Sequence, residues 1–263
     1  MMPHGLVAAS HCSACRVLVF PLPKLLEAFP RSRPARPSIP REPPKPPPPK
    51  VDERDRVFAF LLALPLELSE PRDTVPIGVA ALVSGCTLAF AADVLSDGGL
   101  RSVLVFSTAH GYLHMAIGLL TSVLVHFDLI HLLANMYFLY AFGRFLERQL
   151  GTGLTLSLFA SSAVAAAMAF WAVHTGQERA LGGASGAVSG ILGCYFALFP
   201  GRMVGISLFF MVLKVPAVVY LGWWLLIQLV SVPAEQGIAY SAHAGGFLAG
   251  LVWGLVMRIQ ERR

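Results

Sequence analysis

A glycine-flanked serine and a histidine in two separate apolar stretches are the residues best suited to chemistry. Ser185 lies in the string Gly182-Gly183-Ala184-Ser185-Gly186, at the expected start of a helix. Glycines let the backbone approach a substrate closely, and the unpaired N–H groups at a helix start favour a developing negative charge. His243, in Ala242-His243-Ala244-Gly245-Gly246, could accept the serine proton and return it to a leaving amine. The pair predicts nucleophilic hydrolysis.

Two further polar residues, His131 and Asn135, stand four positions apart in another apolar stretch, so they share one face of a helix. We interpret their side chains as donors to the oxyanion of a tetrahedral intermediate, a contribution of about 3–4 kcal/mol per donor in soluble proteases. For His126, a structural role in the preceding loop and a catalytic role are both open. Since no acidic residue lies within the apolar stretches to orient a histidine, we expect a Ser–His dyad rather than a triad.

Each of these residues also has a non-catalytic interpretation. Ser185 could be the N-cap of a closely packed membrane helix, and His243 could be a packing residue or a metal ligand. A metal site is disfavoured, because no carboxylate or cysteine stands at a comparable depth in the apolar stretches. Cys12 and Cys15 form a lone CxxC without the second ligand pair that a zinc site needs, and their role is left open.

The composition indicates which elements position these residues. Of the 263 residues, 56% are hydrophobic and 13% are charged, whereas soluble domains carry roughly 25% charged residues. The net charge of +5 does not indicate nucleic-acid binding, since the basic residues gather near the N-terminus and around the apolar runs. The composition therefore predicts a membrane protein.

Apolar segments alternate with basic loops along most of the chain. Residues 1–56 are rich in proline and arginine and predict a disordered tail, and 57–72 predict a segment at the membrane surface. The stretch 93–128 is half-apolar and interrupted, and we expect it to lie partly in the interface. Six segments approach the roughly 20 residues that cross a bilayer, at about 75–92, 129–146, 154–173, 184–200, 215–231 and 238–257.

The basic residues predict how these six spans are oriented. If the N-terminus is cytoplasmic, 18 of the 20 Lys and Arg residues fall on the cytoplasmic side, as the positive-inside rule expects. Both ends are then cytoplasmic. Ser185, His243, His131 and Asn135 all fall within roughly 10 Å of the outer boundary, at about 1.5 Å per residue.

Small residues predict which two helices pack together. They recur every four positions in the fourth and the sixth span, which allows close helix approach in lipid. Packing along these ridges brings Ser185 and His243 to the same end of one seam. The residues concerned are Ser185, Ser189, Gly193 and Ala197 in the fourth span, and Ala242, Gly246, Gly250 and Gly254 in the sixth.

Three motifs, in this order and on separate spans, resemble the rhomboid family of intramembrane serine proteases. They are His126 with His131 and Asn135, then Gly183-Ala184-Ser185-Gly186, then Ala242-His243-Ala244-Gly245-Gly246. The resemblance covers roughly residues 115–257. Glu147 also matches a glutamate at the inner end of the same helix as His131, where its role is structural. At the position where some members carry a tyrosine under the histidine ring, this chain has Ser189, and the aromatic–arginine pair of the family's first outer loop is not evident in 93–125.

The resemblance implies an all-α membrane bundle of six transmembrane helices over residues 73–263. It also implies cleavage of membrane-anchored proteins by Ser185 and His243, with an oxyanion site made by His131, Asn135 and the Ser185 N–H. His126, Gly183, Gly186 and Gly246 are supporting residues. We expect no cofactor and no metal, and transmembrane substrates and the lipid bilayer as partners. The expected compartment is a bacterial inner membrane with the site facing outward, and an organellar membrane is the open alternative. The alternatives are a catalytically inactive client-binding member of the family and a small transporter.

Overall fold

A computed structural model describes residues 10–11, 18–19, 65–67, 75–108, 111–208, 211–234 and 237–261. The chain divides into two units, residues 1–38 and 39–263, and each is considered by itself. In the first unit, strands β1 (Ser10–His11) and β2 (Leu18–Val19) pair antiparallel. The remainder of the predicted tail, including Cys12 and Cys15, lies outside the described residues, as does most of the predicted interfacial segment 57–72.

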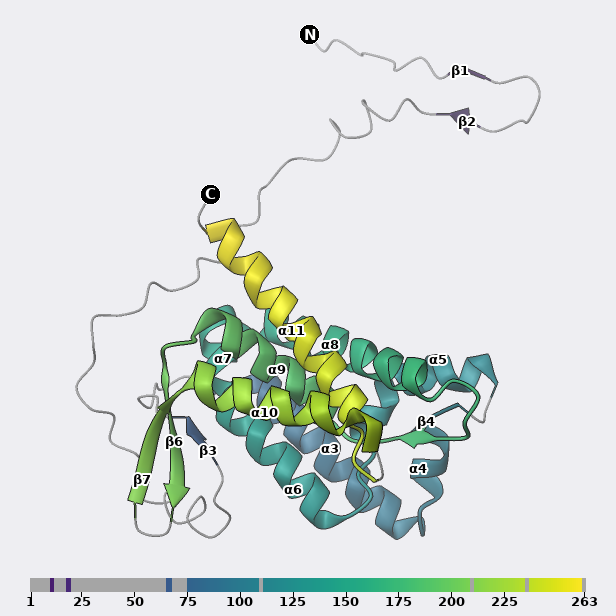
Figure 1. The fold of residues 1–263 in the computed structure, drawn as a ribbon. Coiled ribbons are helices and arrows are strands. Elements are labelled where there is room, and N and C mark those ends of the chain that lie inside the picture. The colour runs from purple at the N-terminus through teal and green to yellow at the C-terminus, as the bar shows by residue number, and fades with distance from the viewer. Residues whose placement is uncertain are drawn as a thin grey trace. The chain divides into compact units, whose positions relative to one another are not determined.

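Helices dominate the second unit, and their bounds fall within a few residues of the six predicted segments (Figure 1). The second predicted segment is one continuous helix in three parts, with a turn of π-helix at η2 between α6 and α7. The helices are α3 (Ile77–Leu95), α6 (Leu129–Phe138), η2 (Leu139–Gly143), α7 (Arg144–Leu150), α8 (Thr152–Val173), α9 (Ser185–Leu198), α10 (Ala217–Ser231) and α11 (Tyr240–Glu261).

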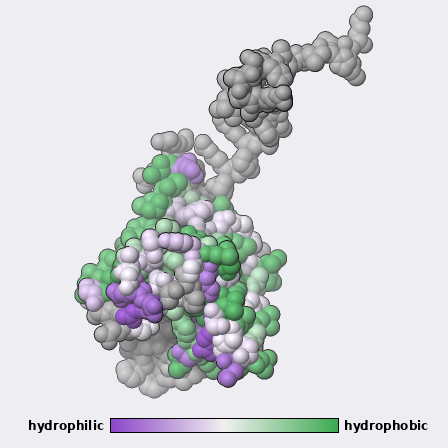
Figure 2. Space-filling model, turned by 90° about the vertical axis from the view of Figure 1, so that its right-hand side faces the viewer, coloured by the Kyte–Doolittle hydropathy of each residue, from purple (hydrophilic) through white to green (hydrophobic). Residues whose placement is uncertain are grey.

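Four helices in the described part of the chain are long and apolar enough to cross a membrane. They are Ile77–Leu95, Leu129–Leu150, Thr152–Val173 and Tyr240–Gln260, while α9 and α10 are shorter apolar helices. Many large apolar side chains are exposed on them, and Figure 2 shows hydrophobic patches between paler and hydrophilic ones on one face of the molecule. An apolar surface of this extent is what a bilayer would cover. The fold is therefore a membrane helix bundle, as the sequence predicts.

Small residues hold α9 between α8 and α11, which lie beside it. A side chain on Gly246 or Gly250 of α11 would collide with the backbone of Gly186 or Gly190 of α9, so the two helices meet backbone to backbone. Against α8, Gly186 and Gly190 lie on Ala166 and Ser162. Nearly every side chain of α9 is buried. Because α9 is surrounded by protein rather than lipid, it does not need the roughly 20 residues of a helix that crosses the bilayer alone.

The structure corrects one detail of the predicted packing. The α11 side of the seam is as expected at Gly246, Gly250 and Gly254, but α9 presents Gly186 and Gly190 to it rather than Ser185 and Ser189. Neighbouring helical residues point about 100° apart, so a shift of one position turns the two serines out of the seam. Both serines line a cavity instead.

A buried carboxylate ties α3 to the end of α7. Glu147 accepts hydrogen bonds from the backbone N–H of Gly78 at 2.8 Å and of Val79 at 2.7 Å, and from the hydroxyl of Thr152 at 2.6 Å. The first N–H groups of a helix lack partners within the helix, and a carboxylate there satisfies both the donors and the helix dipole. The structural role expected for Glu147 is thus helix capping.

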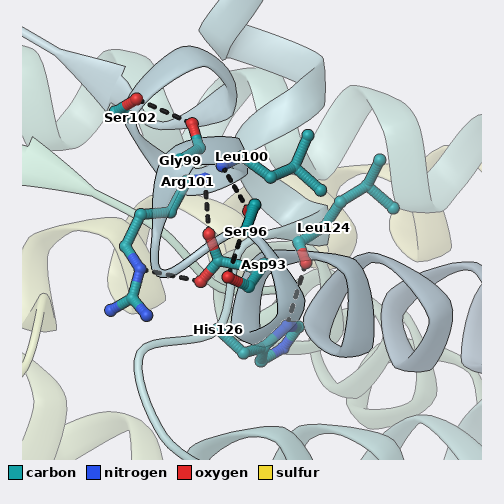
Figure 3. A network of polar contacts seen from close by, with 8 residues as sticks. All are labelled: Asp93, Ser96, Gly99, Leu100, Arg101, Ser102, Leu124 and His126. Carbon is teal, nitrogen blue, oxygen red and sulfur yellow. Dashed lines mark hydrogen bonds and ion pairs between the residues drawn. The ribbon is translucent and has the colours of Figure 1, made fainter.

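The half-apolar stretch 93–128 folds into short elements joined to the end of α3. They are α4 (Gly99–Leu104), β4 (Phe106–Ser107), α5 (Tyr112–Thr121) and η1 (Ser122–Leu124), and β4 pairs with β5 (Ala180–Leu181). The buried side chain of Asp93 accepts the backbone N–H of Arg101 at 2.7 Å and forms an ion pair with the guanidinium at 2.7 Å (Figure 3). The Asp93–Arg101 pair fixes the start of this segment.

A small sheet stands at the connection between α9 and α10, where the sequence predicts only a loop. Strands β6 (Met203–Leu208) and β7 (Met211–Pro216) pair antiparallel, and β3 (Pro65–Glu67) adds to the outer edge of β6. The hydroxyl of Tyr137 donates to the carbonyl of Pro65 at 2.8 Å, which joins the sheet to α6. Beyond it, η3 (Val232–Ala234) follows α10.

Candidate functional site

A cavity of about 750 Å³ opens among α6, α9, α10 and α11. Its wall is mostly apolar, with Phe127, Phe138 and Trp224 among its members. Four predicted site residues from three elements meet in this one space, although they are up to 112 positions apart in the chain. Its polar lining residues include Asp128, His131, Asn135, Ser185, Ser189 and His243.

Ser185 is the first residue of α9, as the glycine-flanked motif predicts. The loop before it is held from two sides: the N–H of Gly183 donates to the Ser122 carbonyl at 2.9 Å, and the N–H of Ala184 donates to Nε2 of His126 at 3.5 Å. The N-cap residue of α9 is Ala184, whose side chain makes no capping hydrogen bond. The serine is therefore not an N-cap, and its backbone N–H belongs to the unpaired first turn of a helix.

His131 and Asn135 project from α6 toward the same loop. The N–H of His131 donates to the Asp128 carboxylate at 2.8 Å, which makes Asp128 the N-cap of α6. The Asn135 amide donates to the His131 carbonyl at 3.0 Å and has a second N–H to offer. A side chain on Gly183 would meet the His131 ring at 2.7 Å, so the ring lies directly on this glycine. Two nitrogen donors thus stand beside the loop that carries Ser185.

His126 supports the site from outside the cavity. It is 1% exposed, its Nδ1 lies 3.3 Å from the Leu124 carbonyl and its ring centroid lies 5.1 Å from that of His131. A neutral imidazole with its proton on Nδ1 donates to Leu124 and accepts from Ala184. Burial, and to a lesser extent the neighbouring His131, lower the pKa of His126 to about 4, which keeps the ring neutral. Of the two roles left open for His126, its contacts are those of a structural bridge.

His243 lies in the first turn of α11, and its ring has a partner that the sequence interpretation missed. Nδ1 of His243 is 2.8 Å from Oε1 of Gln228 on α10. Gln228 is 6% exposed, and the ring of Trp224, one turn earlier, has its centroid 6.1 Å from that of His243. The side chain that pairs with the histidine is an amide rather than an acid. The available signal was a lone glutamine within an apolar helix, where polar side chains find partners.

The remaining predicted residues have packing roles. Gly186 and Gly246 form a backbone-to-backbone contact between α9 and α11, near the end that carries Ser185 and His243. The hydroxyl of Ser189 donates to the Ser185 carbonyl at 2.7 Å, within the same helix. In the described part of the chain, no cluster of three or more His, Cys, Asp or Glu residues is suited to hold a metal ion.

Two comparisons with known proteins bear on this site. A family model described as "Rhomboid domain" matches residues 113–260, which include all the site residues above. The chain is also 30% identical over 154 residues to "Rhomboid protein 1, mitochondrial" of Saccharomyces cerevisiae (strain ATCC 204508 / S288c). That match covers 54% of this chain and 42% of the yeast protein, so the chain spans less than half the length of its relative.

Proposed function

Because the chain belongs to the rhomboid family, we propose that it is an intramembrane serine endopeptidase in which Ser185 is the nucleophile and His243 is the general base. Rhomboid members are generally serine proteases, and this chain is an integral membrane protein. Its sequence carries Ser185 and His243 within the region that matches the family. The observation that carries the proposal is the meeting of Ser185, His243, His131 and Asn135 in one mostly apolar cavity.

The proposed reaction has two stages. Oγ of Ser185 attacks the carbonyl carbon of the scissile peptide bond while Nε2 of His243 takes the hydroxyl proton. The C–N bond then breaks, and the imidazolium returns that proton to the leaving amine, which leaves an acyl ester on Ser185. A water molecule, deprotonated by the same imidazole, attacks the ester and releases the carboxylic acid. The imidazolium gives the proton taken from water to Oγ of Ser185, which regenerates the serine hydroxyl.

The negative oxygen of each tetrahedral intermediate needs donors near Ser185. The N–H at the start of α9 and the side chains of His131 and Asn135 supply them from two helices. Because Gly183 has no side chain, the His131 ring can lie against the loop that carries Ser185. Each donor of this kind contributes about 3–4 kcal/mol in soluble proteases.

The depth of the site favours substrates embedded in the bilayer. Helix α9 has 14 residues and is about 21 Å long, shorter than a hydrocarbon core of about 30 Å. If its C-terminal end reaches the cytoplasmic boundary, Ser185 at the other end lies below the outer boundary. A transmembrane segment that unwinds locally would present its peptide bond at this depth. The proposed substrates are therefore membrane-anchored proteins.

The basic loops favour cytoplasmic chain ends and an outward-facing cavity. For the compartment we propose a bacterial inner membrane, and the name of the yeast relative favours a mitochondrial membrane as the second candidate. Fractionation of the native cells, followed by immunodetection of the chain, separates the two. Accessibility of an introduced cysteine near Asp97 to an impermeant thiol reagent tests the orientation.

The proposed function is tested with the purified chain reconstituted in liposomes beside a model single-span substrate. We expect the wild type to cleave the substrate, and Ser185→Ala and His243→Ala to abolish cleavage. Cleavage that survives Ser185→Ala contradicts the mechanism. A wild type that binds the substrate without cutting it identifies an inactive, client-binding member of the family.

A further inference from the structure

We propose that Gln228 is a positioning residue that holds His243 in the tautomer needed for general-base catalysis. The inference rests on the proposed function and adds to it a third side chain, contributed by α10. The site is then a serine, a histidine and a neutral amide, rather than a serine and a histidine alone.

The contact between the two side chains is short and shielded. Oε1 of Gln228 lies 2.8 Å from Nδ1 of His243, and Gln228 is 6% exposed. The other end of the amide identifies which atom faces the histidine. Nε2 of Gln228 lies 3.5 Å from the Trp224 carbonyl in the same helix, where only a donor fits. The oxygen therefore faces His243 and can only accept.

An accepting oxygen at Nδ1 determines where the imidazole keeps its proton. A neutral imidazole carries one N–H, and pairing it with Gln228 leaves Nε2 unprotonated. Nε2 is the atom that must take the proton of Ser185. Without the amide, the Nδ1–H would be buried without this acceptor and the other tautomer would be populated, which removes the base. Gln228 thus selects the reactive form before substrate binds.

A neutral amide suits a site within a membrane better than the carboxylate of soluble triads. An ionised carboxylate in the middle of α10 would carry a large desolvation cost, whereas an amide accepts the same hydrogen bond without charge. Helix α10 also sets one wall of the site, since Trp224 lines the cavity and lies near the His243 ring. Ser189, in place of the tyrosine of some family members, offers no ring there. Support for His243 comes from α10 instead.

The test compares three variants of the full chain in liposomes. Gln228→Met keeps the length of the side chain and removes the acceptor, and Gln228→Glu keeps an acceptor oxygen. Ile227→Met is the matched control, one position along the helix on an exposed side chain. Gln228 is not among the described residues that line the cavity, whereas Trp224 is. The Gln228 variants should therefore bind substrate as the wild type does. The readouts are kcat, KM and the unfolding temperature.

We expect Gln228→Met to lower kcat by roughly 10- to 100-fold, part of the 10²–10⁴-fold that general acid–base catalysis supplies. In Gln228→Met, KM and the unfolding temperature should stay at wild-type values. Gln228→Glu should keep more of kcat than Gln228→Met, at a lower unfolding temperature because its carboxylate is desolvated, and Ile227→Met should behave as wild type. An unchanged kcat in Gln228→Met overturns the inference. So does a loss of kcat shared equally by both Gln228 variants, which indicates packing alone. Failure of the proposed function looks different, because the wild type itself then shows no Ser185-dependent cleavage.

Discussion

The imidazole of His131 occupies the space that a side chain on Gly183 would need, two residues before the proposed nucleophile. A Cβ on Gly183 would stand 2.7 Å from both Cε1 and Nε2 of the ring, and the backbone there has φ of +123°. Residues with a side chain rarely adopt that backbone conformation, so both the limited space and the φ angle require glycine. The glycine of the motif thus determines how near an oxyanion donor comes to Ser185.

Replacing Gly183 by alanine should impair catalysis more than folding. The added methyl group would displace the His131 ring, and losing one oxyanion donor costs about 10²–10³-fold in kcat. The strained φ should lower the free energy of unfolding by about 1–3 kcal/mol. Both are measured with the reconstituted protein and by thermal unfolding in detergent. Gly201→Ala is the control, since a Cβ there meets nothing within 4 Å. Equal activity in the two variants would refute the donor role of His131.

Glu147→Gln should destabilise the fold without altering the chemistry. One of the two capping oxygens becomes an NH₂ that faces an N–H of α3, and losing a charged hydrogen bond of this kind costs about 1.5–3 kcal/mol. We expect a lower unfolding temperature, while kcat measured well below that temperature is unchanged. Glu178→Gln, at an exposed carboxylate, serves as the control. A variant as stable as wild type would show that Glu147 does not cap α3.

Acid should unfold the protein partly through His126. Its pKa is lowered from 6.5 to about 4 in the folded chain, so the unfolded chain takes up this proton first as the pH falls. Above pH 6.5 the His126 ring is neutral in both states and does not lower the free energy of unfolding. Between pH 6.5 and pH 4 the free energy of unfolding falls, because only the unfolded chain binds the proton. The fall amounts to about 3 kcal/mol at about 1.4 kcal/mol per pKa unit. His126→Gln keeps an acceptor for Ala184 and cannot titrate. Unfolding measured from pH 7 to pH 4 should therefore show a shallower pH dependence in this variant, and identical slopes would contradict the assignment.

Asp93→Asn should loosen the segment between α3 and α6. The substitution removes the ion pair with Arg101. Because the Arg101 side chain is 37% exposed, the loss should be smaller than the roughly 3–5 kcal/mol of a fully buried pair. Hydrogen exchange should rise in residues 99–107. The exposed neighbour Asp97 provides the control as Asp97→Asn. Unchanged exchange in Asp93→Asn would show that the segment is held by its apolar contacts instead.

Most of the helix positions could be predicted, because a helix that crosses a bilayer needs a long apolar run and a charged residue within it is energetically costly. The predicted segment 154–173 lies within α8, which starts at Thr152, and the start of α6 at Leu129 was also predicted. The β6–β7 hairpin was missed, since each strand has six residues and an apolar run of that length does not separate strand from helix.

The site was only partly accessible to sequence interpretation. Motif spacing and depth predicted that Ser185, His243, His131 and Asn135 would meet, and they line one cavity. Their catalytic roles remain predictions. Gln228 could not be predicted in the same way, because the prediction considered ionisable residues at a common depth in the membrane and glutamine is not ionisable. Only the packing of α10 on α11 brings the amide to Nδ1 of His243.

The most direct measurement is labelling of the reconstituted chain with a fluorophosphonate, followed by mass spectrometry of the modified peptide. If His243 activates Ser185, the wild type is labelled at Ser185 alone. Ser185→Ala is then unlabelled, and His243→Ala is labelled far more slowly. Modification of another serine, or labelling of His243→Ala at the wild-type rate, would contradict the proposed mechanism.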